Sequence, residues 1–64
     1  MKISLAAARV NANLTQEGAA QKIGVNRSTI QNWESGKSYP SIPQVRKIEE
    51  VYGCSYDDII FLPA

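Results

Sequence analysis

The apolar and polar positions near the start of this chain repeat with a helical period. Leu5, Ala8 and Ala12 recur at i, i+3 and i+7, which predicts a first helix that begins at residue 2 or 4 and ends at Ala12. Asn13 follows at once, and asparagine is the residue besides glycine that tolerates the left-handed conformation ending a helix. The first helix is therefore expected to stop sharply.

Two further short helices, joined by a tight turn, are predicted between Thr15 and Gly36. Thr15 is a good N-cap for the first of these helices, and Gly24 ends it. Asn26 is the expected N-cap of the next helix, which runs over Arg27–Ser35 and has Gly36 as its C-cap. The pattern predicts a helix-turn-helix over residues 15–36.

The helix over residues 27–35 separates its residues onto two faces at about 100° per residue. Ile30 and Trp33 make one face apolar, so we expect that face to pack on the rest of the domain. The other face carries one guanidinium and several short hydrogen-bonding groups: Arg27, Ser28, Gln31, Asn32 and Ser35. Such a division is typical of a helix that packs on a scaffold and reads base edges in a DNA major groove.

A fourth helix is predicted to start at a capping box over Ser41–Gln44 and to stop at Gly53. Pro43 is tolerated there because it falls in the first turn. Its apolar stripe comprises Ile42, Val45, Ile48, Val51 and Tyr52.

A fifth, short helix is predicted from Ser55, with Pro63 closing it and with Ile59, Ile60 and Tyr56 as its core positions. No strand pattern is evident. The expected fold class is all-α: five short helices in one domain over residues 1–64, with the second and third helices forming the helix-turn-helix.

Composition limits the remaining classes of protein. A chain of 64 residues hides only about 60% of its unfolded surface, so its core is thin. The single cysteine, Cys54, excludes an intramolecular disulfide, and we expect it to be a small buried apolar residue. Met1 is followed by neither a secretory signal nor an apolar run of about 20 residues, which favours a cytoplasmic protein without a membrane partner.

The residues offer little to catalysis. There is no histidine, no glycine-rich phosphate loop and no cluster with metal-ligand spacing. The expectation is a protein that is not an enzyme and that has no cofactor, no metal and no evident small-molecule substrate. The adjacent carboxylates Asp57 and Asp58 are better explained by helix capping.

The charge is small but unevenly distributed. The net charge is +1, yet residues 1–40 hold five basic and two acidic residues, hence +3, and residues 41–64 hold two basic and four acidic ones, hence −2. A basic N-terminal part suggests one side that faces an anion.

These residues together resemble the lambda-repressor-like helix-turn-helix family, and within it the phage repressor and Cro type of transcriptional regulator. The resemblance extends from about Leu5 to Leu62, and the spacing from Gln16 to Gly36 has no gap. The matching positions are Leu14–Glu17, Ala20, Gly24, Val25, Ile30, Trp33–Lys37, Pro40 and Gly53–Ser55.

The resemblance implies roles for particular residues. Double-stranded DNA is the implied partner, with base contacts from Asn26, Arg27, Ser28, Gln31 and Asn32 and backbone contacts from Gln16, Lys37 and Ser35. Gln16 resembles the phosphate-clamping glutamine of the family, and the free N–H groups of a helix N-terminus suit an anion independently. Arg9 and Glu34 match a structural ion pair that joins the first and third helices in several relatives.

The resemblance also implies a homodimeric repressor at a palindromic operator, because a monomer with this few basic residues would make few phosphate contacts. Two recognition helices about 34 Å apart would then read two half-sites. Tyr39 and Phe61 are the main candidates for the dimer surface, followed by Ile42, Tyr52 and Leu62; the alternative is that these residues complete the core.

One other function remains open from the sequence. The weak net charge also suits a protein-interaction module, such as an antitoxin-like or regulator-binding domain, that uses the same scaffold without reading DNA.

Overall fold

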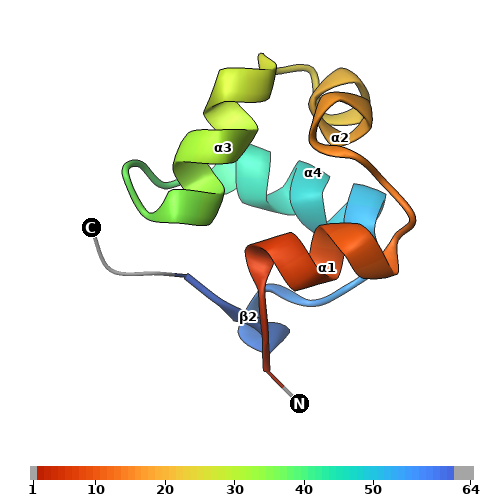
Figure 1. Cartoon of the computed structure of the whole chain (residues 1–64). Coiled ribbons are helices and arrows are strands. Elements are labelled where there is room, and N and C mark those ends of the chain that lie inside the picture. The colour runs from red at the N-terminus through yellow and green to blue at the C-terminus, as the bar shows by residue number, and fades with distance from the viewer. Residues whose placement is uncertain (1, 62–64) are drawn as a thin grey trace.

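A computed structural model of the protein describes residues 2–61, in which four α-helices pack around one core (Figure 1). A short 3-10 helix and two two-residue strands complete it. In chain order the elements are β1 (Ile3–Ser4), α1 (Leu5–Asn11), α2 (Gln16–Ile23), α3 (Arg27–Ser35), α4 (Ile42–Tyr52), the 3-10 helix Tyr56–Asp58 and β2 (Ile59–Ile60). Within residues 2–61 no helix is long and apolar enough to cross a membrane.

The helix ends lie where local chemistry predicts them. Ser4 Oγ accepts a hydrogen bond from Ala7 N at 3.1 Å, so Ser4 is the N-cap and α1 starts at Leu5, one residue after the later of the two expected positions. It ends at Asn11, one residue before the expected Ala12. Asn13 adopts a φ of 61°, the left-handed conformation expected after α1. Thr15 Oγ1 caps α2 by accepting from Gly18 N at 3.0 Å, and Gly24 ends α2 with a φ of 90°. Gln44 Oε1 accepts from Ser41 N at 2.8 Å in the capping box of α4.

The predicted fifth helix is wrong from Ile59 onward within the described residues, and Pro63, its expected end, lies outside them. Ser55 does start a helical turn, since its Oγ accepts from Asp57 N at 3.3 Å, but the turn spans only Tyr56–Asp58. The chain then extends as β2 and pairs in parallel with β1, with Ile3 opposite Ile59. A run of β-branched residues favours this extended conformation once a partner strand is available.

The structure also corrects the expectation that no strand forms, and it corrects two expected core positions, Ile60 and Tyr56. Successive side chains of a strand point to opposite faces, so Ile59 is buried and Ile60 is 48% exposed. Tyr56 is 49% exposed as well. Cys54 packs against the core but is only half-buried.

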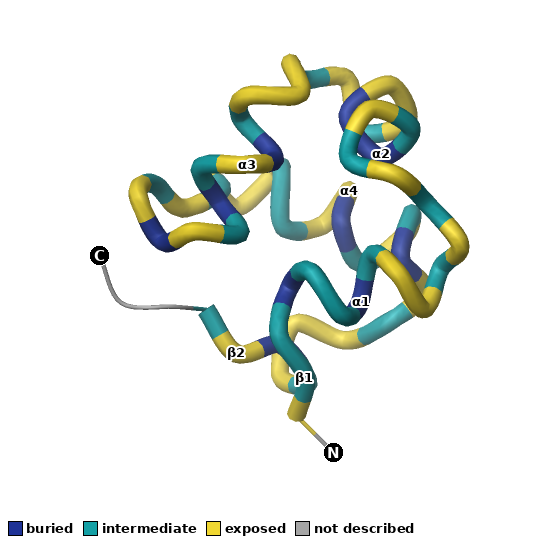
Figure 2. Tube along the Cα trace, viewed as in Figure 1, coloured by how far each residue is buried: buried dark blue, intermediate teal, exposed yellow. Residues whose placement is uncertain are grey.

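The core lies where the four helices and β2 meet (Figure 2). Ala19 and Ala20 of α2 are 0% and 3% exposed, and their small side chains leave room for a neighbouring helix to approach closely. Ile30 and Trp33 of α3 are 1% and 3% exposed. The predicted apolar face of α3 is therefore the face that packs on the scaffold.

Tyr52 of α4 is buried, at 7% exposed, so it belongs to the core and not to an external surface. Its hydroxyl has no hydrogen-bond partner among the described residues. Burial, followed by the negative charge of Glu34, raises the pKa of Tyr52 to about 12 from 10.0. A buried hydroxyl without a partner costs free energy.

We therefore expect the free energy of unfolding of Tyr52→Phe at pH 7, measured by urea titration, to lie within about 1 kcal/mol of the wild-type value. Because the folded-state pKa of Tyr52 lies above its ordinary value of 10.0, the wild type keeps its full stability below pH 10 and loses some of it between pH 10 and 12. Tyr52→Phe should lose less in that window. A loss of more than about 2 kcal/mol at pH 7 would show that the hydroxyl is satisfied in solution.

Candidate nucleic-acid interface

The outward face of α3 is polar and accessible. Arg27, Ser28 and Gln31 are exposed, and Asn32 is half-buried beside them. The opposite face holds Ile30 in the core, so α3 cannot turn these side chains inward without exposing its apolar residues. The helix-turn-helix therefore presents a fixed row of hydrogen-bonding groups to solvent.

Asn26 begins α3 in an unusual way. Its backbone has the extended conformation of an N-cap, with φ −77° and ψ 154°, but its side chain makes no capping hydrogen bond. The expected cap is thus present in backbone conformation only. The exposed amide of Asn26 remains available for an external partner, in contrast to the hydroxyl of Thr15, which is used to cap α2.

The C-terminal end of α3 is closed by its own backbone. The carbonyl of Asn32 accepts from Lys37 N at 2.9 Å and from the hydroxyl of Ser35 at 3.3 Å. Gly36, with a φ of 81°, makes the turn possible. Lys37 follows Gly36 directly in this turn and is exposed.

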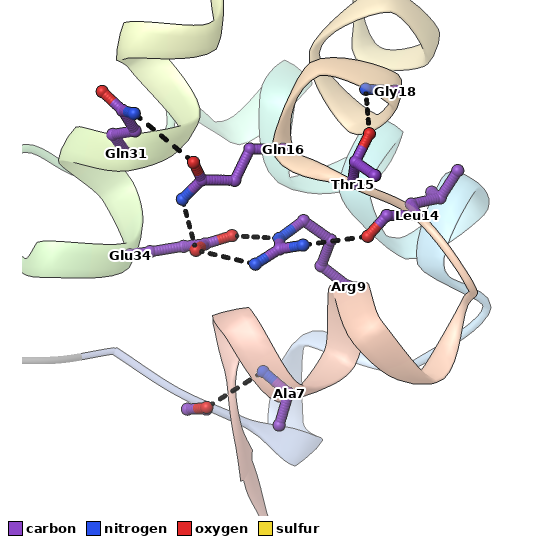
Figure 3. A network of polar contacts seen from close by, with 9 residues as sticks. Ala7, Arg9, Leu14, Thr15, Gln16, Gly18, Gln31 and Glu34 are labelled. Atoms are coloured by element: carbon purple, nitrogen blue, oxygen red, sulfur yellow. Dashed lines mark hydrogen bonds and ion pairs between the residues drawn. The ribbon is translucent and has the colours of Figure 1, made fainter.

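Three helices meet at one carboxylate (Figure 3). Glu34 of α3 forms an ion pair with Arg9 of α1, with Arg9 Nε 2.7 Å from Glu34 Oε2. Arg9 Nη2 also donates to Glu34 Oε1 at 3.4 Å, and Arg9 Nη1 donates to the carbonyl of Leu14 at 2.9 Å. The side chains of Arg9 and Glu34 are only 14% and 9% exposed, so their charges are shielded from water.

Gln16, the first residue of α2, is part of the same network. Gln16 Nε2 donates to Glu34 Oε1 at 3.1 Å, and Gln16 Oε1 accepts from Gln31 Nε2 at 3.4 Å. The structure thus places two predicted DNA-contacting residues, Gln16 and Gln31, in direct contact with each other. The helical pattern gave no signal for either bond, because both join side chains of different helices.

The electrostatics of the network keep Arg9 charged. Its hydrogen bond to Glu34 raises the pKa of Arg9 and outweighs the opposing effect of burial. Cys54 lies elsewhere, and its burial raises the pKa of its thiol, with Asp58 and Glu49 adding to the effect. The thiol is therefore kept protonated and unreactive at neutral pH.

The comparison with known proteins agrees with this geometry. The family profile described as helix-turn-helix matches residues 5–59 of the chain. The chain belongs to the Cro/C1-type helix-turn-helix family. Membership of this family supports DNA-binding transcription regulation as the broad function, and the family is generally not one of enzymes.

Several relatives carry the same motif. An uncharacterised HTH-type transcriptional regulator of Methanocaldococcus jannaschii is 44% identical over 59 residues, which cover 92% of this chain and 89% of that protein. An uncharacterised HTH-type transcriptional regulator of Archaeoglobus fulgidus is 41% identical over 51 residues, covering 80% of this chain and 72% of that protein.

A longer relative has a more specific name. The HTH-type transcriptional activator BcrR of Enterococcus faecalis is 36% identical over 52 residues, 81% of this chain. The match spans only 26% of the length of BcrR. No solved structure gives a significant match to the chain.

The ion pair supplies a test of how α3 is held. Removing one partner leaves the other charge half-buried, so Arg9→Met and Glu34→Gln should each lower the free energy of unfolding by about 1–3 kcal/mol. The double variant should lose less than the sum, with a coupling energy of about 1 kcal/mol or more in urea titrations.

The matched control uses Lys22→Met and Glu17→Gln, because both residues are exposed and lie on α2 outside the network. That pair should show additive effects within about 0.5 kcal/mol. Equal additivity for Arg9 and Glu34 would contradict a role of their contact in stability.

Proposed function

We propose that this protein is a sequence-specific DNA-binding regulator whose α3 enters the major groove. The observation that carries the proposal is the exposed polar face of α3, held rigidly by a buried apolar face within a matched helix-turn-helix. An α-helix of this kind fits the major groove, and its N-terminal residues reach base edges.

The residues of that face take distinct roles. Arg27 can donate two hydrogen bonds to O6 and N7 of a guanine, and the amide of Asn32 matches the edge of an adenine. Asn26 and Ser28 extend the readable row at the N-terminal end of α3. Gln16, Lys37 and Ser35 contact the DNA backbone on either side of the row. Backbone contacts set the register, and base contacts select the sequence.

The regulator binds as a homodimer through an apolar groove beside α4. The groove has a volume of about 870 Å³, and its lining includes Tyr39, Ile42, Tyr56 and Phe61. Ile42 is 74% exposed and Tyr39 is 50% exposed, whereas Phe61 packs between two tyrosine rings with centroid distances of 6.3 and 5.6 Å. Leu62, another candidate for this surface, lies outside the described residues.

The charges of the groove suit a two-fold interface. Arg46 and Glu49 both line it, so a second copy in the opposite orientation would bring a cation of one chain near a carboxylate of the other. The domain extends 27 Å along its longest axis, so two copies can place their α3 helices about 34 Å apart, one turn of DNA. Such a dimer reads a palindromic operator and represses by blocking RNA polymerase.

Two substitutions separate base reading from phosphate binding. Arg27→Ala should relax the preference at one base-pair position by about 1–3 kcal/mol. Lys37→Ala should weaken binding to all duplexes alike and lower the salt slope by about one. Fluorescence titrations at several salt concentrations measure both. If both variants bind the selected site as the wild type does, the proposed docking is wrong.

The dimer is tested at Ile42. Ile42→Gln removes an exposed apolar side chain from the groove and should raise the dimer dissociation constant at least about tenfold, measured by analytical ultracentrifugation. Val10→Gln is the matched control, since Val10 is 59% exposed on α1 and does not line the groove. Equal dissociation constants for the two variants would place the interface elsewhere.

Selection of bound duplexes from a random pool tests the whole proposal. A palindromic site with half-sites about 10 bp apart is expected. A motif without symmetry would contradict the dimer. A complete absence of salt-sensitive binding at low salt would favour the protein-interaction module, and a reporter gene with the selected site in its promoter measures whether the effect is repression.

A further inference from the structure

The charge of Glu34 determines which atoms donate and which accept in the hydrogen bonds around Gln16. Glu34 is an anion paired with Arg9, so its carboxylate can only accept. The side of Gln16 that faces Glu34 must therefore be Nε2, which donates at 3.1 Å. Oε1 of Gln16 then faces Gln31, whose Nε2 must donate at 3.4 Å. The charge on Glu34 thus determines the orientation of both amides.

This arrangement leaves Gln16 one free donor. Nε2 carries two hydrogens, one of which is used by Glu34. A single hydrogen bond would let the amide pivot, but a second bond at its other heteroatom stops that rotation. The remaining hydrogen of Gln16 is therefore restricted in direction, on the first residue of α2.

The bond to Gln16 also restricts Gln31, because it uses one of the two hydrogens on Gln31 Nε2. A two-bond contact with an adenine needs both the donor and the acceptor of a glutamine amide. The donor of Gln31 is directed toward Gln16, across the gap between α3 and α2 (Figure 3). Its second Nε2 hydrogen and its Oε1 remain, but the bond to Gln16 restricts the directions in which they can point.

We propose that Gln31 is a positioning residue that acts through Gln16: it orients the Gln16 amide for a DNA phosphate and does not read a base. The proposal rests on the proposed function and revises one of the base contacts expected from the sequence, that of Gln31. In this proposal a residue of α3, Gln31, contributes to phosphate binding by Gln16 of α2. The sequence preference then depends on fewer residues of α3.

The test is a double-variant cycle in DNA binding. Gln16→Met should weaken binding to every duplex by about tenfold, and Gln31→Met by about three- to tenfold. The double variant should bind no more weakly than Gln16→Met alone, because Gln31 acts only through Gln16. Neither substitution should change the salt slope, since a neutral side chain releases no counterion.

The matched control is Gln21→Met. Gln21 is an exposed glutamine of α2 that takes no part in the network, so its substitution should leave affinity and preference unchanged. The 3.4 Å bond between two exposed amides adds little to stability, so thermal unfolding of Gln31→Met should match that of the control.

A spectroscopic measurement on the free protein checks the bond itself. The side-chain NH2 resonances of Gln16 should shift in Gln31→Met and stay in place in Gln21→Met. Unchanged resonances in Gln31→Met would overturn the proposal, whatever happens with DNA.

The binding outcomes are separable. A changed preference at one base pair in Gln31→Met, or a double variant whose loss is the product of the single losses, would overturn the positioning role while leaving the regulator intact. If the wild type binds no duplex, it is the proposed function that fails, and the resonance shifts alone then report on the contact between Gln31 and Gln16.

Discussion

The orientation of α3 depends on the carboxylate of Glu34. This carboxylate accepts from a side chain of α1, at 2.7 Å from Arg9, and from a side chain of α2, at 3.1 Å from Gln16. A shielded ion pair of this kind contributes little net stability, because desolvation offsets most of the attraction. Its consequence is geometric: apolar packing holds α3 against the scaffold, and the directional bonds to Glu34 restrict its rotation about its own axis.

The small size of the chain explains why polar groups orient α3 and why some apolar side chains remain exposed to solvent. Four short helices enclose a core in which Ile30 and Ile48 are the largest fully buried side chains among residues 2–61. Small residues such as Ala19 let α2 lie close to its neighbours, but they add little apolar area. A core this thin cannot cover Ile42 and Tyr39 as well. The small core therefore has two consequences. The orientation of α3 depends on hydrogen bonds to Glu34, and apolar side chains remain exposed in the groove that we propose as the dimer surface.

Local features of the sequence predict α1 to α4, because caps and glycine stops act within a few residues. Thr15 and Gly24 are examples, and both ends of α2 lie as expected. The fifth helix fails because its conformation is decided by residues far away: Ile59 pairs with Ile3, and no local pattern contains that partner. In the candidate site, too, local features can be predicted from the sequence and contacts between helices cannot. The two faces of α3 follow from its period, whereas the contact of Gln31 with Gln16 crosses between helices and cannot be found from spacing alone.

The low charge of the domain explains why oriented amides and a second copy would both matter for the proposed DNA binding. Among the residues that we assign to the proposed interface, only Arg27 and Lys37 are cations, so one domain would release about two counterions through them, with a salt slope near −2. Such an interface cannot depend on electrostatic attraction alone. It must obtain its affinity from neutral donors that are already aimed, since an amide fixed before binding loses less entropy on contact. In the proposed dimer, a second copy would double every contact, those of the fixed amides and those of the cations. Oriented amides and the dimerisation that we propose would therefore both compensate for the small number of cations.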